Sequence, residues 1–410
     1  MVILFALGFV LEKTDRGRVM RPVRSLADKI GITIPLPTLT PEEMREANEM
    51  AQVWRKDALK KYPTLAISSH TVPDDENGFL MLYQLDATME ISSEFEDALP
   101  MTGSDYDPVK ANRFLEEHQE IVTHIEKIAA LPTRSSINMP DDYEGFIGAR
   151  KILKASKILM LRACLAADDG RVDEALHDIR RAGKIVNHLR DIETPFLLSE
   201  AVAITVELSR QTIVLEEVLP KLGPQTDLTP WLVEMDCANS FNNRRLAVLM
   251  RGEWHTSGRY MGYPLIAQMD LMGQLADGKA SAMAYAEWTV KETRRANAAK
   301  PFEIIPELDP KMAFSHLDRE TRDLISMMNF GTNQWTKGMQ RSAVVVARNV
   351  AAIELLMLEQ SGTVLSEDST QQVTVDPITN RPFLFDPATR EVGIADSVVC
   401  TNEEPVKLPW

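Results

Sequence analysis

Apolar residues recur at intervals of three and four through most of the chain, the spacing that places side chains on one face of an α-helix. The pattern is sharpest in residues 146–189, where Asp168, Asp169 and Gly170 separate two amphipathic stretches. The second stretch carries one apolar stripe, formed by Val172, Leu176, Ile179, Ala182, Val186 and Leu189. Two such stretches joined at an Asp-Gly turn predict an antiparallel helical hairpin of the tetratricopeptide kind, without the full signature or strict period of that repeat.

Further helices are predicted where the same periodicity continues. One begins near Thr40, because Thr40 can cap it, Pro41 suits a first turn, and the acidic residues that follow favour the positive end of the helix dipole. Segment 194–219 is apolar nearly all round, so we expect it to be buried. The predicted helices after the first span residues 77–91, 105–131, 194–219, 229–261, 265–276, 280–299 and 332–360.

The C-terminal tail has a different pattern. Helicity stops at residues 360–362, and the tail alternates between apolar and polar residues. Phe383–Phe385 and Glu391–Ile394 predict the arms of a β-hairpin, and Asn380 stands where a positive φ is favoured. The predicted fold is all-α: an antiparallel helical-pair array, either an irregular tetratricopeptide-like solenoid or a bundle, with a small C-terminal β-hairpin. Its predicted parts are an apolar segment with a Pro-rich linker (1–41), a helical body (42–362) and a hairpin tail (363–410).

The chain opens with an apolar run, Met1–Leu11, which charged residues follow at once. A membrane-spanning helix needs about 20 apolar residues, so this run is short for one. Two interpretations stay open: a short helix docked on the domain, or the trailing half of a membrane anchor that begins upstream. We expect a protein of the cell envelope, anchored in the membrane and facing the periplasm; the alternative is a soluble cytoplasmic protein.

Composition narrows the possible functions. The chain has 60 acidic and 45 basic residues, and its net charge of -15 argues against binding to nucleic acid. Aromatic residues make up only 6%, which favours helix over sheet. Cys164, Cys237 and Cys400 form no Cys-x-x-Cys pair, so neither a zinc nor a redox motif is predicted.

The most suggestive polar cluster lies within residues 242–260. On a continuous helix Arg244, Arg251, His255 and Arg259 share one face, with Glu253 alongside. Guanidinium groups match the geometry of carboxylates and phosphates, so this stripe is a candidate site for an anionic ligand or a partner's acidic helix. The alternative is that these arginines pair with acidic neighbours inside the fold and that Gly252 breaks the helix.

Other polar groups favour structural roles. Glu207 and Arg210 lie one turn apart and predict an intrahelical ion pair, whereas Glu200 and Glu207 are too far apart for paired catalytic carboxylates. His118 and His124 point to different sides of their helix, which predicts a solvated charged face. The sequence has no Gly-rich phosphate loop and no nucleophile elbow, and we predict no metal and no cofactor.

Four motifs, in this order, resemble those of an uncharacterised family of membrane-anchored, tetratricopeptide-like helical bacterial proteins. They are PDDENGF (73–79), the stretch 141–182 ending in LMLRACLAADDGRVDEALHDIRRA, MRGEW (250–254) and VDPITNRPFLFD (375–386). The family closes with an Asp-Pro-x-Thr-Gly-x-Pro hairpin, and Asn380 stands here in place of its Gly. The resemblance implies a helical architecture and a membrane-associated location, and no particular chemistry.

Three hypotheses for function follow. The favoured one is a non-enzymatic protein-binding or scaffold protein whose helical array presents a face to a protein partner. The second is a structural subunit of a larger membrane-associated assembly, attached through Met1–Leu11 and the hairpin. The third is a hydrolase-like enzyme, which requires Arg251, Glu253 and His255 to converge on one water-accessible cleft.

Overall fold

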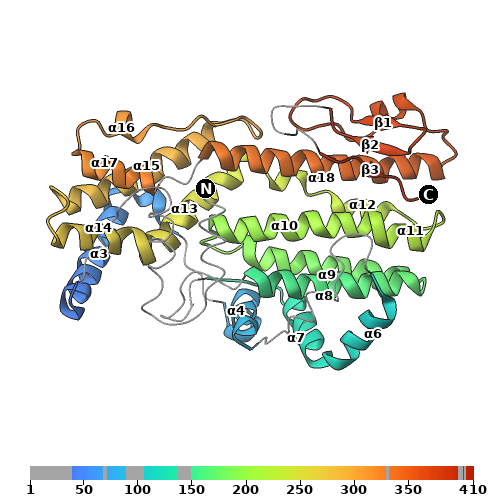
Figure 1. Cartoon of the computed structure of the whole chain (residues 1–410), viewed down its shortest axis with the longest axis horizontal. Helices are drawn as coiled ribbons and strands as arrows, with labels where there is room; N and C mark the ends of the chain where they lie inside the picture. The colour runs from blue at the N-terminus through green and yellow to red at the C-terminus, as the bar shows by residue number, and fades with distance from the viewer. Residues whose placement is uncertain are drawn as a thin grey trace.

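The computed structural model describes residues 39–67, 72–88, 106–136, 149–328, 332–395, 400 and 403–410. Within these ranges the protein is mostly α-helical, with packed helix pairs and a small antiparallel sheet near the C-terminus, which confirms the predicted fold class (Figure 1). The α-helices are α3 (Pro41–Lys61), α4 (Gly78–Thr88), α6 (Pro108–Glu117), α7 (Gln119–Ala130), α8 (Ala149–Asp168), α9 (Val172–Arg190), α10 (Leu197–Ile213), α11 (Leu219–Leu222), α12 (Thr229–Met235), α13 (Asn243–Ser257), α14 (Tyr263–Leu271), α15 (Gly278–Ala298), α16 (Pro310–Ala313), α17 (Arg319–Met327) and α18 (Thr332–Gln360).

Shorter helical segments connect these elements. Four of the described segments are 3₁₀ turns: η1 (Pro63–Leu65), η2 (Asp74–Glu76), η4 (Ala238–Ser240) and η6 (Glu367–Gln372). Two are π-helical turns that extend an α-helix by one wider turn: η3 (Val214–Val218), after α10, and η5 (Gly258–Gly262), after α13.

The larger hydrophobic core is built on α8, α9 and α10, which lie side by side in Figure 1. The α8–α9 hairpin turns at Gly170, whose φ of 70° lies in the left-handed region that glycine adopts at no steric cost. The predicted stripe of α9 faces inward, with Ile179 and Ala182 fully buried. The predicted helical hairpin is therefore confirmed.

A second core lies at the other end of the molecule, where α3, α14 and α15 pack with the end of α13. Its largest side chains are Trp54, Trp254, Tyr263 and Tyr285. Thr40 caps α3 as predicted, because its hydroxyl accepts from the backbone N–H of Glu43 while the Glu43 carboxylate accepts from the backbone N–H of Thr40.

Helix α18 runs along the molecule and carries the sheet against its C-terminal half (Figure 1). Strands β1 (Leu384–Asp386) and β2 (Glu391–Gly393) form the predicted antiparallel hairpin, with Phe385 opposite Val392. A third strand, β3 (Val406–Lys407), pairs with β2 and was not predicted, because two residues are too few to show an alternating pattern. Asn380 has the expected positive φ, of 55°.

Two predicted helices proved to be broken. The predicted helix 105–131 is interrupted at His118, because α6 packs on α8 whereas α7 also packs on α9. The predicted helix 229–261 is interrupted between α12 and α13, where the Asn242 side chain caps α13 by accepting from the backbone N–H of Arg245. The predictions for Met1–Leu11 and the Pro-rich linker lie almost entirely outside the described residues.

Candidate functional site

Helix α13 is continuous from Asn243 to Ser257, so Arg244, Arg251 and His255 lie along one side of it, as their spacing predicts. Arg244 is exposed and Arg251 half-buried two turns later, with Val248 between them; we call these three residues the outer face of α13. Among the described residues, neither arginine has a hydrogen-bond or ion-pair partner. Arg259 is exposed but lies in the π-helical turn beyond the end of α13.

His255 continues the same stripe, yet it is buried under α3 and η1. Its Nδ1 atom lies 2.9 Å from Nη2 of Arg55, and its Nε2 atom lies 2.6 Å from the carbonyl oxygen of Leu65. A guanidinium can only donate, so Nδ1 accepts and Nε2 carries the proton that is donated to Leu65. Burial lowers the pKa of His255 to about 4. His255 is thus a neutral group at a packing interface.

Glu253 faces a different neighbour from His255. Its Oε2 atom accepts from the backbone N–H of Leu197, at the first residue of α10, at 2.9 Å, and its other oxygen accepts from the Ser257 hydroxyl. Burial raises the pKa of Glu253. The convergent cleft of Arg251, Glu253 and His255 that the hydrolase hypothesis requires is therefore not formed, because the two buried groups point into two separate interfaces.

Gly252 explains why the segment before α10 lies so close to α13. A Cβ atom at Gly252 would lie 1.8 Å from the carbonyl oxygen of Pro195, so only glycine lets the segment before α10 approach α13 this closely. The expectation that Gly252 breaks the helix is wrong, since α13 passes through it without interruption. Trp254, two residues further on, is fully buried, so every residue of the MRGEW motif except Arg251 packs inside the fold.

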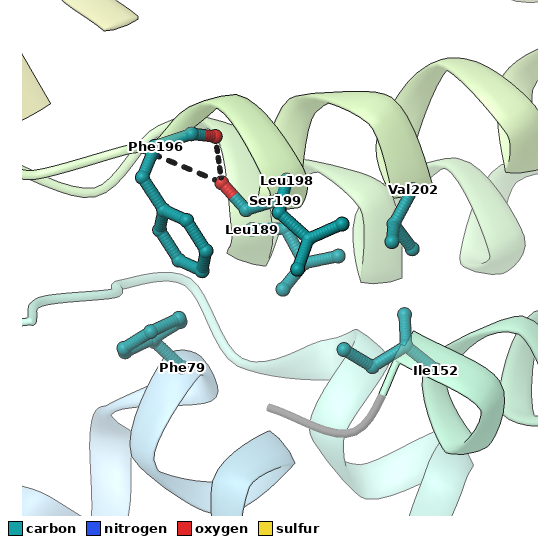
Figure 2. Close-up of a pocket in the computed structure, with 7 residues that line it drawn as sticks. All are labelled: Phe79, Ile152, Leu189, Phe196, Leu198, Ser199 and Val202. Carbon is teal, nitrogen blue, oxygen red and sulfur yellow. Dashed lines mark hydrogen bonds between the residues drawn. The ribbon is translucent and has the colours of Figure 1, made fainter. Parts of the chain in front are cut away.

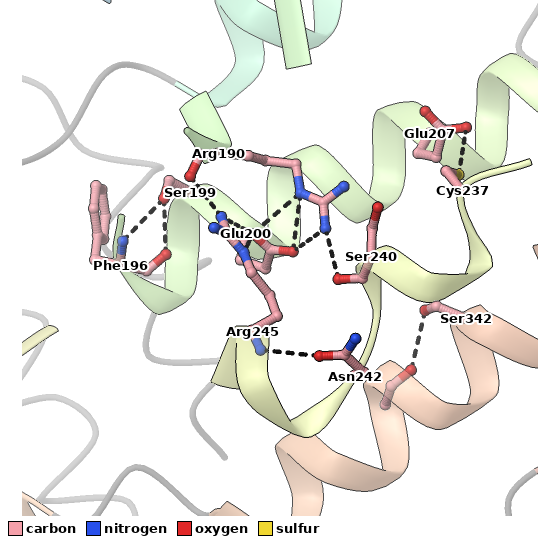
Figure 3. Close-up of polar contacts among 11 residues, drawn as sticks. Arg190, Phe196, Ser199, Glu200, Glu207, Cys237, Ser240, Asn242, Arg245 and Ser342 are labelled. Carbon is pink, nitrogen blue, oxygen red and sulfur yellow. Dashed lines mark hydrogen bonds and ion pairs between the residues drawn. The ribbon is translucent and has the colours of Figure 1, made fainter. Parts of the chain in front are cut away.

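The inner side of α13 holds a buried ionic cluster (Figure 3). Glu200 is fully buried and accepts from Nη2 of Arg190 at 2.7 Å and from Nη2 of Arg245 at 2.6 Å. Arg190 also donates to the carbonyl oxygen of Ser240, which holds the turn between α12 and α13. Burial alone raises the pKa of Glu200, but the two guanidiniums hold it below its ordinary value. The carboxylate stays charged and joins three helices.

A second ionic pair follows on α10, and it confirms the predicted pairing of Glu207 with Arg210, at 2.7 Å. Arg210 also reaches Glu234 of α12 at 2.6 Å. The Cys237 thiol donates to Glu207 at 3.1 Å (Figure 3), and burial raises the pKa of this thiol. Cys237 is thus a free thiol whose hydrogen bond to Glu207 joins it to the ionic pair.

The partners of Glu200 were missed at the sequence level. A carboxylate in a nearly all-apolar helix requires a cation, and this was the available signal. The sequence did not indicate which arginines would supply it, because Arg190 and Arg245 reach it from separate helices.

A small apolar recess lies between α4, α8, α9 and the start of α10 (Figure 2). Phe79 and Phe196 line one side, and the recess has room for about one water molecule. Its one polar side chain, Ser199, is engaged with the backbone of Phe196. The recess is too small to hold a ligand.

The PDDENGF motif positions the helix beside this recess. The Asn77 side chain accepts from the N–H groups of Phe79, Leu80 and Ser135, and it donates to the carbonyl oxygen of Ser135. Gly78 lies against the His188 ring, where a Cβ atom would approach within 2.3 Å. The motif therefore has a structural role: it fixes α4 to residues 133–136 and to α9.

Within the described part of the chain, no group of three or more His, Cys, Asp or Glu side chains has a metal-binding arrangement. His118 and His124 are both half-buried and belong to α7 and its N-terminal boundary. The three cysteines are free. In the same described ranges, every helix is too short or too polar to cross a lipid bilayer.

No family model matches the chain, and searches against curated proteins and against solved structures each gave no significant match. What is established is a mostly helical protein with a small three-stranded C-terminal sheet.

Proposed function

We propose that this protein is a non-enzymatic binding or scaffold protein and that the outer face of α13 contacts an acidic segment of a protein partner. The supporting observation is a contrast between arginines. Arg190, Arg210 and Arg245 are each paired with a carboxylate inside the fold, whereas Arg244 and Arg251 have no such partner among the described residues. The chain has 60 acidic residues, yet these two arginines, which lie on one face of α13, pair with none of the described ones. This favours an anion from outside the protein as their partner.

The spacing on α13 suggests the form of the partner. Arg244 and Arg251 are seven residues apart, which is about 10.5 Å along a helix axis. Acidic side chains spaced by seven residues on a partner helix match this distance. Val248 lies between the arginines and supplies apolar contact area. The net charge of -15 opposes the approach of an extended polyanion such as nucleic acid or an anionic membrane, whereas a short acidic helix needs to approach only the local positive charge of Arg244 and Arg251.

We further propose a location in the cell envelope, as in the family that the four motifs resemble. The support is the apolar run Met1–Leu11 and the order of PDDENGF, residues 141–182, MRGEW and VDPITNRPFLFD. Fractionation of native cells tests this: the protein is expected in the membrane fraction and to resist a high-salt wash. Recovery in the soluble cytoplasmic fraction contradicts the location and leaves the binding proposal to its own test.

Site-specific photocrosslinking tests the binding face. A photoreactive amino acid at Val248 is expected to give one dominant adduct with an acidic protein in native cells. The double variant Arg244→Glu, Arg251→Glu is expected to abolish this adduct, because charge reversal replaces attraction by repulsion.

Two controls accompany the crosslinking. The photoreactive residue at Val233, an exposed position on α12, should not give the adduct. The variant Arg45→Glu, Arg294→Glu makes the same charge change at two other exposed arginines and should leave the adduct intact. Identical adducts at positions 248 and 233 contradict the proposal. A fixed stoichiometry in the native mass of the captured complex favours the alternative, a structural subunit of an assembly.

A further inference from the structure

Arg55 and His255 are 200 residues apart in the sequence and lie in contact near the C-terminal end of α13. Arg55 of α3 donates to Nδ1 of His255, and Nε2 of His255 donates to the carbonyl oxygen of Leu65 in η1. The Arg55 guanidinium also lies over the Trp254 ring, 5.3 Å from its centroid. The residue His255 is 6% exposed. The ring therefore contacts both α3 and η1, and the contact with Arg55 of α3 requires the neutral form, in which Nδ1 keeps its lone pair.

Protonation removes one of these interactions and adds repulsion. The proton must enter at Nδ1, which then has no lone pair for Arg55 and becomes a donor facing a donor. The new imidazolium also lies near the guanidinium of Arg251 on α13. The Nε2–H still donates to Leu65, but a buried cation that faces two other cations, with a guanidinium opposite its new Nδ1–H, is strongly unfavourable.

The surrounding acids do not offset this charge. On α3, Asp57 is bound to Lys279 at 2.8 Å and to Lys60 at 3.4 Å. On α15, Glu287 is bound to Lys291 at 2.8 Å and to the Tyr62 hydroxyl at 3.2 Å. On α14, the titratable neighbour is Tyr263, which is buried beside Trp254. No described carboxylate forms an ion pair with His255.

We propose that the Arg55–His255 contact is an acid-sensitive latch that holds α3 and η1 against α13. When the latch opens, the hydrogen bond from Arg55 of α3 is replaced by repulsion, Leu65 of η1 remains the only hydrogen-bond partner of His255 among the described residues, and the positive charge next to Arg251 increases. This inference goes beyond the binding role proposed above and does not depend on it, because it concerns the free protein.

The direction of the pH dependence follows from the folded and unfolded states. Burial lowers the pKa of His255 in the folded protein to about 4, whereas an unfolded histidine has a pKa of about 6.5. A depressed pKa contributes stability above the unfolded value, and this stability is lost as the pH falls from about 6.5 towards 4. The latch is therefore closed at neutral pH and weakens in this window.

Hydrogen exchange of the whole chain tests the latch. Exchange is measured at pH 7 and pH 4.5 and corrected for intrinsic rates. We expect protection of residues 41–65 to fall by about tenfold or more in the wild type. His255→Gln is expected to keep its protection, because a glutamine side chain can accept from Arg55 and donate to Leu65 without titrating. His188→Gln, the matched control, replaces another buried histidine whose pKa burial lowers to about 4, and should behave as the wild type in residues 41–65.

The wild type alone also tests the latch, in case His255→Gln does not fold. Imidazole ¹⁵N chemical shifts should show the Nε2–H tautomer of His255 at pH 7, and protection of residues 41–65 should fall below about pH 6.5 and level off near the pH at which His255 of the folded protein titrates. Equal loss of protection in the wild type and in His255→Gln overturns the proposal. So does protection of residues 41–65 that stays unchanged between about pH 6.5 and the pH at which His255 titrates.

Discussion

Arg244 and Arg245 are adjacent residues of the same type on the same helix, yet their surroundings differ completely. Arg245 turns inward and binds Glu200 at 2.6 Å, and its side chain is 15% exposed. Arg244 is exposed and, among the described residues, has no ionic partner. Each residue of an α-helix is rotated by about 100° from the previous one, and this rotation alone separates the two roles.

The comparison of Arg244 with Arg245 shows that the number of charged residues does not determine which of them are available to bind a ligand. An arginine in the interior is fixed there because removal of its partner leaves an uncompensated buried charge, and it has no capacity left for a ligand. An arginine at the surface contributes little to stability and is available for binding. The inner and outer sides of α13 should therefore respond oppositely in stability and in binding when they are mutated.

The largest expected effect is on the inner side. Glu200→Ala leaves both Arg190 and Arg245 buried without their carboxylate, so we expect a loss of about 3–5 kcal/mol in the free energy of unfolding. Denaturant titration at pH 7 measures it. Glu46→Ala, at an exposed position of α3, is the control and should change stability by less than about 0.5 kcal/mol. A loss below about 1 kcal/mol for Glu200→Ala contradicts the structural role of the cluster.

A smaller effect is expected where α13 meets the segment before α10. Gly252→Ala introduces a Cβ atom against the carbonyl oxygen of Pro195, and overpacking of this kind costs about 1–3 kcal/mol. Gly338→Ala on α18 is the matched control. Its new Cβ meets nothing within 4 Å, and alanine is the better helix former, so we expect a gain of up to about 1 kcal/mol. Thermal melts of the two variants should shift in opposite directions; shifts of the same sign contradict the close approach at Gly252.

The smallest effect on stability is expected on the outer side. Arg244→Ala and Arg251→Ala should each change the free energy of unfolding by less than about 0.5 kcal/mol, because neither side chain has a described partner to lose. The same variants should weaken the crosslink at position 248. A loss of stability as large as that of Glu200→Ala would mean that these arginines are structural after all.

Much of the fold was predictable because it follows from local patterns. The bounds of α18 agree with the predicted 332–360, the Thr40 cap forms, and the turn at Gly170 joins α8 to α9. The breaks at His118 and before α13 were not predicted, because they depend on which neighbouring helix each half packs against. Periodicity reports the apolar side of a helix and not the identity of its neighbour.

The candidate site was predicted only in part, for a similar reason. The shared helix face of Arg244 and Arg251 follows from their spacing, and the Glu207–Arg210 pair is local. The burial of His255 depends on Arg55 and Leu65, and that of Glu253 depends on Leu197, all of them far away in sequence. The sequence could not indicate that the residues with the most suggestive chemistry would be used to hold helices together.

The Asn77–Gly78 dipeptide has a consequence for the ageing of this protein. Asn-Gly is the pair that deamidates most readily, through attack of the glycine nitrogen on the asparagine side-chain carbonyl. Here the Gly78 N–H is donated to Thr133 at 2.9 Å, and the Asn77 side chain is fully engaged. The reaction therefore requires these hydrogen bonds to break first. The rate at which isoaspartate forms at position 77 should then report how often α4 separates locally from residues 133–135.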